Sequence, residues 1–226
     1  MVKIYKFFPV IFLAFGILLI GTVSTVSIGG YIKNRAVSSP VNSNANSSNE
    51  NHNYKNDDMD NKKIFFNKPG KIPEKTSIKV YKKKKILELY ADKKLIGRFD
   101  ISLGSSIDGK KEMQGDNKTP EGNYYICYKT NKTKHTYFIG ISYPNIQDAK
   151  KGLEQGTIDK QTFDRIKSAI DEKKQPPWNT ALGGDVGIHG GKDNHNLTCG
   201  SVMLSNDDIN ILKKYVTLNT PVDIYE

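Results

Sequence analysis

Short apolar runs separated by polar turns occupy the second half of the chain and predict strands. Three of these runs, at residues 78–81, 86–91 and 95–103, are divided by turns of Lys and Asp and predict a β-meander. Two more, at residues 123–129 and 136–142, are rich in Tyr, Ile and Phe, which favour strands. The pattern therefore predicts a domain that is mainly β.

The end of the chain continues this pattern with shorter elements. Residues 186–189 and 202–204 predict two short strands, and residues 221–225 predict a closing strand. The segment Ser205–Asp208 resembles a capping box with Asp in the usual Glu position. A stripe of larger apolar residues at helical spacing follows it: Ile209, Leu212 and Tyr215.

Residues 145–178 have a helical pattern instead. Apolar residues recur there at helical spacing, with charged residues between them: Phe163, Ile166 and Ile170. They predict one amphipathic helix, for which Asp159 or Thr157 is a plausible cap. A shorter helix is expected at residues 146–153.

Strands and helices do not alternate along the chain, which disfavours a doubly wound parallel sheet. The predicted fold class is therefore mainly β (α+β), with a helical insertion at about residues 145–178. Lys82–Lys85 are expected to form an exposed hairpin turn. Trp178 and the helices before it have two alternative roles: a lid over a cleft, or an extra packed layer.

The first segment of the chain predicts a membrane anchor. Residues 7–32 carry no charged side chain. As a helix this run would extend about 39 Å, which exceeds the ~30 Å core of a bilayer. Lys3 and Lys6 precede it and favour a cytoplasmic N-terminus, although Lys33 and Arg35 weaken the bias. A cleaved signal peptide is the alternative, but no clear cleavage site is present.

Three parts of the chain follow from composition. Residues 1–35 are the predicted membrane anchor, and residues 36–75 a flexible polar tether, because Asn and Ser dominate and little apolar surface is available to offset the entropy of ordering. Residues 76–226 suit one domain with its own core. Ile64–Phe66 either docks onto that domain or remains free.

The net charge of +10 suits a polyanionic neighbour such as a lipid surface or acidic wall polymers. No nucleic-acid-binding motif is present, and the predicted anchor would place the domain outside the cytoplasm, so nucleic acid is not expected as a partner. The two cysteines, Cys127 and Cys199, do not form a disulfide framework. An extracytoplasmic setting would permit a bond between them, and the sequence leaves that open.

Candidate chemistry gathers near the C-terminal end. His189 lies in a glycine-containing segment, Gly187–Gly191, and Ser201 lies in the turn Thr198–Leu204. An imidazole titrates near neutral pH and transfers protons in both directions, whereas a hydroxyl in a glycine-containing turn is a potential nucleophile. A structural, hydrogen-bonded histidine is the alternative interpretation of His189.

Taken together, these motifs resemble the L,D-transpeptidase (YkuD-like) catalytic domain family. The family has an apolar-His-Gly segment followed by a Ser/Thr-x-Gly-Cys-apolar turn, and its cysteine position is occupied here by Ser201. The segment Gly115–Ile126 resembles the family's K-T-P-x-G-x-Y/F strand entry. Residues 141–145 resemble a stretch found in a subgroup of the family that carries a helical insertion. The resemblance extends over about residues 76–226.

The resemblance implies a β-sandwich-like domain that cuts and rejoins peptidoglycan stem peptides, with no metal or organic cofactor. His189 matches the catalytic histidine, and Gly190 matches the position whose backbone orients that ring. Thr198 matches a position that binds substrate or holds the turn. Gly200 and the backbone amide of Ser201 match the site that stabilises the oxyanion.

The serine at position 201 leaves the chemistry open. A thiol has a pKa near ~8.5 and a neighbouring imidazole converts it to thiolate readily, whereas an alcohol needs concerted proton removal by an oriented base. Ser201 is therefore either a nucleophile or part of an inactive turn. Cys199 is a possible alternative nucleophile, but its place two residues away shifts it several ångströms.

A metal site is a weaker alternative, because the spacings of the candidate ligands match no standard zinc pattern: His189, Asp193, His195 and Cys199. The leading hypothesis is a cell-wall enzyme anchored in a bacterial cytoplasmic membrane, with its domain outside the cytoplasm, acting as a transferase or carboxypeptidase on stem peptides. The second is an inactive module that binds peptidoglycan or serves as a scaffold. Protein partners are not indicated by the sequence.

Overall fold

The computed structural model describes residues 63–106, 108–191 and 197–226. The expected membrane anchor at residues 7–32 lies outside these ranges, as does most of the expected tether. Within the described ranges, no helix is both long enough and apolar enough to cross a membrane.

The predicted meander is confirmed. β2 (Thr76–Tyr81), β3 (Ile86–Ala91) and β4 (Lys94–Asp100) pair antiparallel in chain order. On β2, Ile78 and Val80 are fully buried while Lys79 between them is not. This alternation follows from the period of two along a strand, which turns one face of β2 toward the core.

A further strand precedes the meander. β1 (Phe65–Phe66) pairs antiparallel with β4, and the ring of Phe66 stacks on that of Phe99 at a centroid distance of 6.3 Å. Of the two alternatives for Ile64–Phe66, the structure therefore shows docking onto the sheet.

The remaining predicted strands all form: β5 (Gly122–Thr130), β6 (Phe138–Ile141), β7 (Gly187–Gly191), β8 (Val202–Ser205) and β9 (Pro221–Tyr225). β5, β6 and β7 pair antiparallel in order, and β8 adds parallel to β7. β9 does not close an edge. It lies between β2 and β5 and joins the two halves of the sheet, parallel to β2 and antiparallel to β5.

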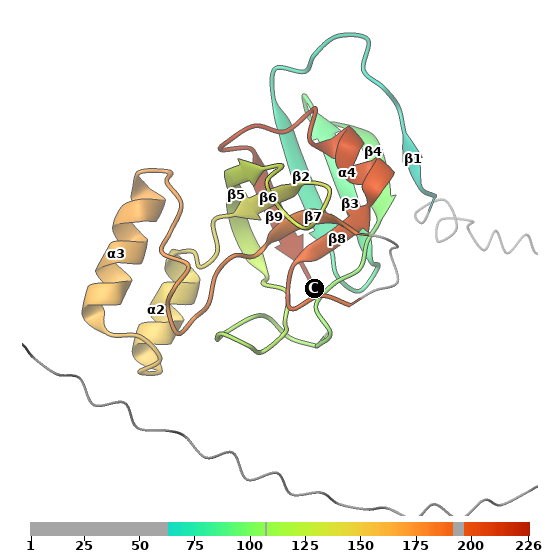
Figure 1. Ribbon diagram of the computed structural model, residues 1–226. Helices are drawn as coiled ribbons and strands as arrows, with labels where there is room; N and C mark the ends of the chain where they lie inside the picture. The colour runs from blue at the N-terminus through green and yellow to red at the C-terminus, as the bar shows by residue number, and fades with distance from the viewer. Residues whose placement is uncertain (1–62, 107, 192–196) are drawn as a thin grey trace, which may run out of the picture. The chain divides into compact units, whose positions relative to one another are not determined.

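The expected sandwich-like domain is one curled sheet of nine strands in the order β1-β4-β3-β2-β9-β5-β6-β7-β8 (Figure 1). The curl brings the segment after β4 onto β8. Ser102 and Met203 exchange two backbone hydrogen bonds there, of 2.9 and 2.8 Å. The inner faces enclose the main core, which includes Leu89, Ile126 and Leu204.

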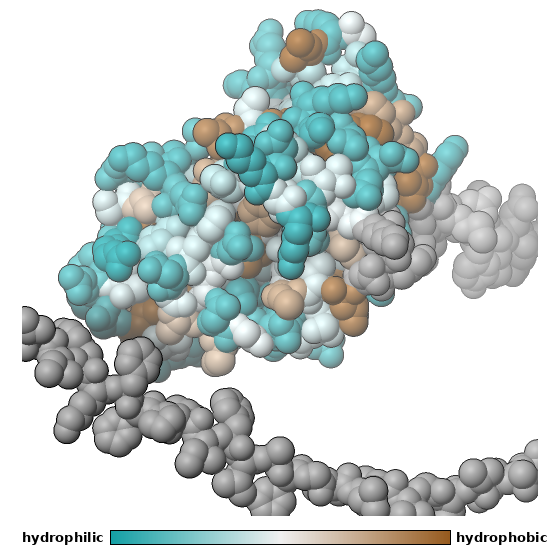
Figure 2. All heavy atoms as spheres, in the orientation of Figure 1, coloured by the Kyte–Doolittle hydropathy of each residue, from teal (hydrophilic) through white to brown (hydrophobic). Residues whose placement is uncertain are grey.

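The helical insertion has a small apolar core of its own. α2 (Ile146–Glu154) and α3 (Lys160–Asp171) confirm the two helices predicted there. Asp159 caps α3 by accepting a hydrogen bond from the backbone N–H of Thr162 at 2.8 Å. The pair encloses Ala149, Ile158, Ile166 and Leu182. It lies beside β5 and β6 (Figure 1), and hydrophilic residues cover most of its visible surface (Figure 2).

α4 (Asn206–Leu212) begins at the predicted cap. The hydroxyl of Ser205 accepts a hydrogen bond from the backbone N–H of Asp208 at 3.1 Å and donates one to its carboxylate at 2.7 Å. This cap satisfies one of the free N–H groups at the helix start and fixes where β8 ends. Ile209 and Leu212 of the predicted stripe are fully buried.

The turn between β2 and β3 corrects one prediction. Lys83 is exposed as expected, but Lys82 is only 1% exposed. Its ammonium donates to the carbonyls of Gly109 and Thr119 at 2.6 and 3.2 Å, and to the carboxylate of Glu121 at 2.7 Å. These three acceptors compensate for the loss of water around the buried charge, so Lys82 fastens the 109–121 loop to the sheet.

The two neighbouring lysines provide a matched stability test. Lys82→Ala leaves a partly buried carboxylate and two carbonyls without their cation, and should lower the free energy of unfolding by about 3 kcal/mol. Lys83→Ala removes only an exposed ion pair with Glu226 and should change it by less than about 1 kcal/mol. Urea unfolding followed by circular dichroism measures both. Equal effects of the two substitutions would contradict the described role of Lys82.

Candidate active site

Strand register places three side chains together on one face of the sheet. Phe138 on β6 is paired with His189 on β7, and His189 is paired with Met203 on β8. Since neighbouring strands present paired residues on the same side, these three side chains line one cleft. The alternate residues, such as Ile188 and Val202, point the other way into the core.

The ring of His189 is held in one orientation. It is 5% exposed, and its Nδ1 lies 2.8 Å from the carbonyl oxygen of Gly190. Because a carbonyl can only accept, Nδ1 carries the proton and Nε2 of the neutral ring is left to accept one. Gly190 is required beside it, since a Cβ there would lie 2.8 Å from the Asn206 side-chain oxygen.

The turn containing Ser201 is closed by the hydroxyl of Thr198. That hydroxyl donates to the carbonyl of Ser201 at 2.6 Å and accepts from the N–H of Gly200 at 3.1 Å. The N–H of Gly200 is therefore engaged within the turn. Among the described residues the N–H of Ser201 has no hydrogen-bond partner, so it is the amide of this turn best suited to an oxyanion.

Two other segments fasten this turn to the sheet. The backbone of Thr198 exchanges hydrogen bonds with Leu103 and Ser105, at 2.9 and 3.0 Å. Gly200 has a φ of +126°, and a Cβ there would lie 2.6 Å from the carbonyl oxygen of Lys118. The turn thus packs at Gly200 directly against the backbone of Lys118, and only glycine allows such a close approach.

Ser201 and His189 line the same cleft, but they are not bonded to each other. The hydroxyl oxygen of Ser201 accepts the backbone N–H of Gly187 at 3.2 Å, and no hydrogen bond joins it to the His189 ring within the described part of the chain. Accepting from Gly187 leaves the hydroxyl proton free to be donated. The Ser201 hydroxyl is therefore able to donate a hydrogen bond but, among the described residues, is not bonded to the His189 ring.

The cleft has a volume of about 690 Å³ and a basic rim. The β5–β6 loop forms one wall, with Lys132 and Lys134, and the turn at residues 197–201 forms another. A broader groove of about 890 Å³ follows α3, but no histidine or cysteine is among the residues that line it. His189, Ser201 and Cys199 line the cleft of about 690 Å³ instead.

The two cysteines are free thiols and form no disulfide. Cys199 is exposed and lines the cleft, whereas Cys127 on β5 is half-buried and burial raises its pKa to about 12. Cys127 is thus an unreactive thiol. Two members of the alternative metal set, Asp193 and His195, lie outside the described residues; within them no group of three His, Cys, Asp or Glu is placed to hold a metal.

Two titratable residues of the cleft were missed in the sequence. The ring of His135, from the β5–β6 loop, stacks on that of His189 with a centroid distance of 4.0 Å and an interplanar angle of 28°. Asp185, in the loop before β7, also lines the cleft. Both belong to polar loops without a motif, so strand pattern gave no reason to place them beside His189.

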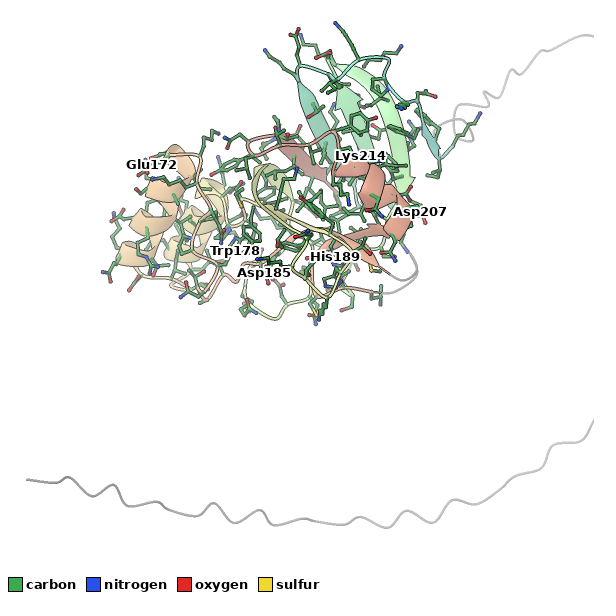
Figure 3. The ribbon with its side chains drawn as sticks, turned by 45° about the horizontal axis from the view of Figure 1, so that its top comes forward. Glu172, Trp178, Asp185, His189, Asp207 and Lys214 are labelled. Atoms are coloured by element: carbon green, nitrogen blue, oxygen red, sulfur yellow. The ribbon has the colours of Figure 1, made fainter. Side chains whose placement is uncertain are left out.

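Trp178 packs as part of an extra layer. It contacts the rings of Tyr128 and Phe138 edge-on, at 5.9 and 6.4 Å, and Gly140 and Gly184 leave room for it. Trp178 contacts Phe138 but is not among the residues that line the cleft, whereas Asp185 and His189, labelled with it in Figure 3, are.

Burial is the largest cause of the pKa shifts of His189, His135 and Asp185 in the cleft. It lowers the pKa of His189, and the positive charges of His135 and Lys134 lower it further, although the bond to Gly190 opposes the shift. Burial and Lys134 also lower the pKa of His135, while Asp185 raises it. Burial raises the pKa of Asp185. His189 is therefore neutral, and able to act as a base, near pH 7.

A neutral imidazole and a hydroxyl on one cleft, beside a free backbone amide, are the parts of a nucleophilic acyl-transfer site. The family model for the L,D-transpeptidase catalytic domain (YkuD) matches residues 75–224, so the chain belongs to this family. Members of the family are L,D-transpeptidases that act on peptidoglycan stem peptides.

Solved structures with a similar fold include the helical cell shape determining protein Pgp2 from Campylobacter jejuni, at 21% identity and a TM-score of 0.47, covering 68% of this chain and 49% of that one. Bd1075 from Bdellovibrio bacteriovorus is 21% identical, with a TM-score of 0.45, covering 72% and 54%. The chain thus spans about half the length of these proteins. No curated protein matches it.

The protonation of His189 can be measured directly. We expect the ring to titrate with a midpoint below its ordinary value of ~6.5, because burial and two neighbouring positive charges disfavour the imidazolium ion. By linkage, the unfolded chain then binds more protons than the folded one below ~6.5, and this residue's contribution to stability is lost as pH falls from there through the lower pKa of the folded state. Carbon-13 shifts of labelled histidine give the midpoint. A midpoint above 6.5 would contradict the described environment.

The turn can be tested at Thr198. Thr198→Val keeps the shape but removes both hydroxyl hydrogen bonds, and we expect any acylation of the protein by a stem peptide to fall by about 100-fold, since an oxyanion donor worth that much loses its position. Thr198→Ser retains the hydroxyl and should keep most of the rate. Mass spectrometry of the acylated protein measures both. Equal rates in the two variants would show that the hydroxyl does not hold the turn.

Proposed function

We propose that this protein is a membrane-anchored acyltransferase of L,D-transpeptidase type, which acts on peptidoglycan stem peptides outside the cytoplasm of a bacterium. The observation that carries the proposal is the arrangement of His189 and Ser201 on one cleft, with Nδ1 of the ring tied to Gly190 and Nε2 left as proton acceptor. Family membership supports the substrate class.

The proposed organisation has three parts. Residues 1–35 hold the chain in the membrane, residues 36–75 form the tether, and residues 76–226 form the catalytic domain. The apolar run at residues 7–32 supports the anchor, and the Asn- and Ser-rich composition that follows supports the tether. Lys132 and Lys134 on the rim of the cleft favour a peptide that carries carboxylates.

In the proposed reaction, Nε2 of His189 takes the proton of the Ser201 hydroxyl as the oxygen attacks a peptide carbonyl carbon. The backbone N–H of Ser201 stabilises the oxyanion that forms. The tetrahedral species then collapses to an ester on Ser201, and the imidazolium returns its proton to the departing amine. A second amine attacks the ester to give a cross-link, or water attacks it to give a carboxypeptidase product.

One feature favours a second candidate function, that of a stem-peptide-binding module without catalysis. The third group behind His189 is a neutral carbonyl, which orients the ring but provides no negative charge to stabilise the imidazolium ion. A thiolate needs less help of this kind than an alcohol does. Ser201 also accepts a hydrogen bond from Gly187 rather than contacting the ring.

A trapping experiment separates the two candidates. The full-length protein in detergent is incubated with tetrapeptide-stem muropeptides and analysed by mass spectrometry. We expect an acyl adduct on Ser201 that is absent in Ser201→Ala, is reduced at least 100-fold in His189→Ala and persists in Cys199→Ala.

The result for Ser201→Cys completes the test. If wild type and Ser201→Ala are equally inert while Ser201→Cys forms an adduct, the site binds stem peptides without serine catalysis and the enzyme proposal is wrong. An adduct on Cys199 would instead show that this thiol is the nucleophile.

A further inference from the structure

The stacking of His135 on His189 is the closest ring contact of the cleft described above. The two centroids are 4.0 Å apart and the planes differ by 28°, so the rings overlap face to face. The rings come from different elements, since His135 belongs to the β5–β6 loop and His189 to β7. A contact of this kind restricts the tilt of the buried ring, whose Nδ1 is already bonded to Gly190.

Stacking also couples the charges of the two rings. Two imidazolium ions at this separation repel strongly in a partly buried site, so the protonation of one ring opposes that of the other. His189 must become an imidazolium ion during the proposed acyl transfer. A neutral His135 permits this step, whereas a protonated His135 opposes it.

Charged side chains and one thiol face this pair from the surrounding elements. Lys134 and Lys132 lie on the same loop as His135, and Cys199 belongs to the turn across the cleft. Asp185 comes from the loop before β7 and is the acidic residue among those lining the cleft. Its carboxylate attracts a proton on His135, whereas Lys134 repels one.

We propose that His135 is a positioning residue of this site: stacked on His189, it holds the imidazole in the orientation in which Nε2 serves Ser201, and it links the charge state of that ring to its own. This inference rests on the proposed function for its consequence in catalysis, but the stack itself is independent of turnover. Asp185 completes the unit, because its carboxylate favours the charged form of His135 against the opposing effects of burial and Lys134.

The titration of His189 tests the proposal without any need for activity. The chain has four histidines, so single substitutions assign each carbon-13 signal in the full-length protein in detergent. His135→Phe keeps an aromatic ring in the stack but removes its charge, so the midpoint of His189 should rise. His135→Ala removes both the charge and the ring that shields His189 from water, so the midpoint of His189 should rise further toward its ordinary value.

Lys132→Ala is the matched control for this measurement. It removes a positive charge from the same loop and the same cleft without touching the stack, so the midpoint of His189 should stay as in the wild type. His135 is only partly buried on a loop, so its substitution should leave the unfolding transition in place. If the midpoint is the same in the wild type, His135→Phe and His135→Ala, the proposed coupling is wrong.

Asp185→Asn gives a second, independent test. Asp185 has a φ of +53°, which asparagine also tolerates, so the change removes charge and little else. His135 should then titrate at a lower pH. If stem-peptide acylation is observed, its acid limb should move to lower pH in Asp185→Asn, and His135→Phe should keep the neutral-pH rate that His135→Ala loses by about tenfold.

The outcomes separate this proposal from the proposed function. Absence of acylation in every variant, with the expected shifts of the His189 midpoint, would reject the enzyme and retain the positioning role. Normal acylation with an unchanged midpoint in both His135 variants would reject the positioning role and retain the enzyme. An unchanged titration of His135 in Asp185→Asn would remove Asp185 from the unit.

Discussion

The parallel pairing of β7 with β8 is the interaction on which the site depends. It places His189 opposite Met203 and therefore brings Ser201, two residues earlier than Met203, to the mouth of the same cleft. Backbone hydrogen bonds between Ser102 and Met203, from the N–H of Thr198 to the carbonyl of Leu103 and from the N–H of Ser105 to the carbonyl of Thr198 then fix the serine turn to the far end of the curled sheet. These main-chain bonds and the side-chain hydroxyl of Thr198 together set the position of the Ser201 hydroxyl.

Glycines make this arrangement possible at two points. Gly190 lets the histidine strand pass close to the start of α4, and Gly200 lets the serine turn rest on the carbonyl of Lys118. A Cβ at Gly200 would lie 2.6 Å from a backbone oxygen, which cannot move aside, and a Cβ at Gly190 would displace the side chains of Asn206 and Ile209. The glycines that flank the histidine and the serine in the sequence are therefore needed for packing, in addition to any role in stabilising an oxyanion.

The strands, the helical insertion and the positions of His189 and Ser201 could be predicted from the sequence, because period-two burial and glycine-flanked motifs are local signals. The central position of β9 could not, since a terminal strand gives no local sign of its neighbours. Lys82 was mistaken for a surface residue because the acceptors of its ammonium come from residues 109–121. His135 and Asp185 were missed for the same reason, as their role follows only from contact across the cleft.

The balance between base strength and charge stabilisation decides the chemistry of this cleft. Burial keeps His189 neutral and thus ready to accept a proton, and the carbonyl of Gly190 raises the pKa of the ring but carries no negative charge of the kind a carboxylate would provide for the imidazolium ion. Reaction with a fluorophosphonate probe measures directly whether Ser201 is nevertheless activated. We expect a phosphonyl adduct on Ser201 that is lost in His189→Ala. Equal labelling of Ser201 with and without the imidazole, or labelling at another residue alone, would contradict it.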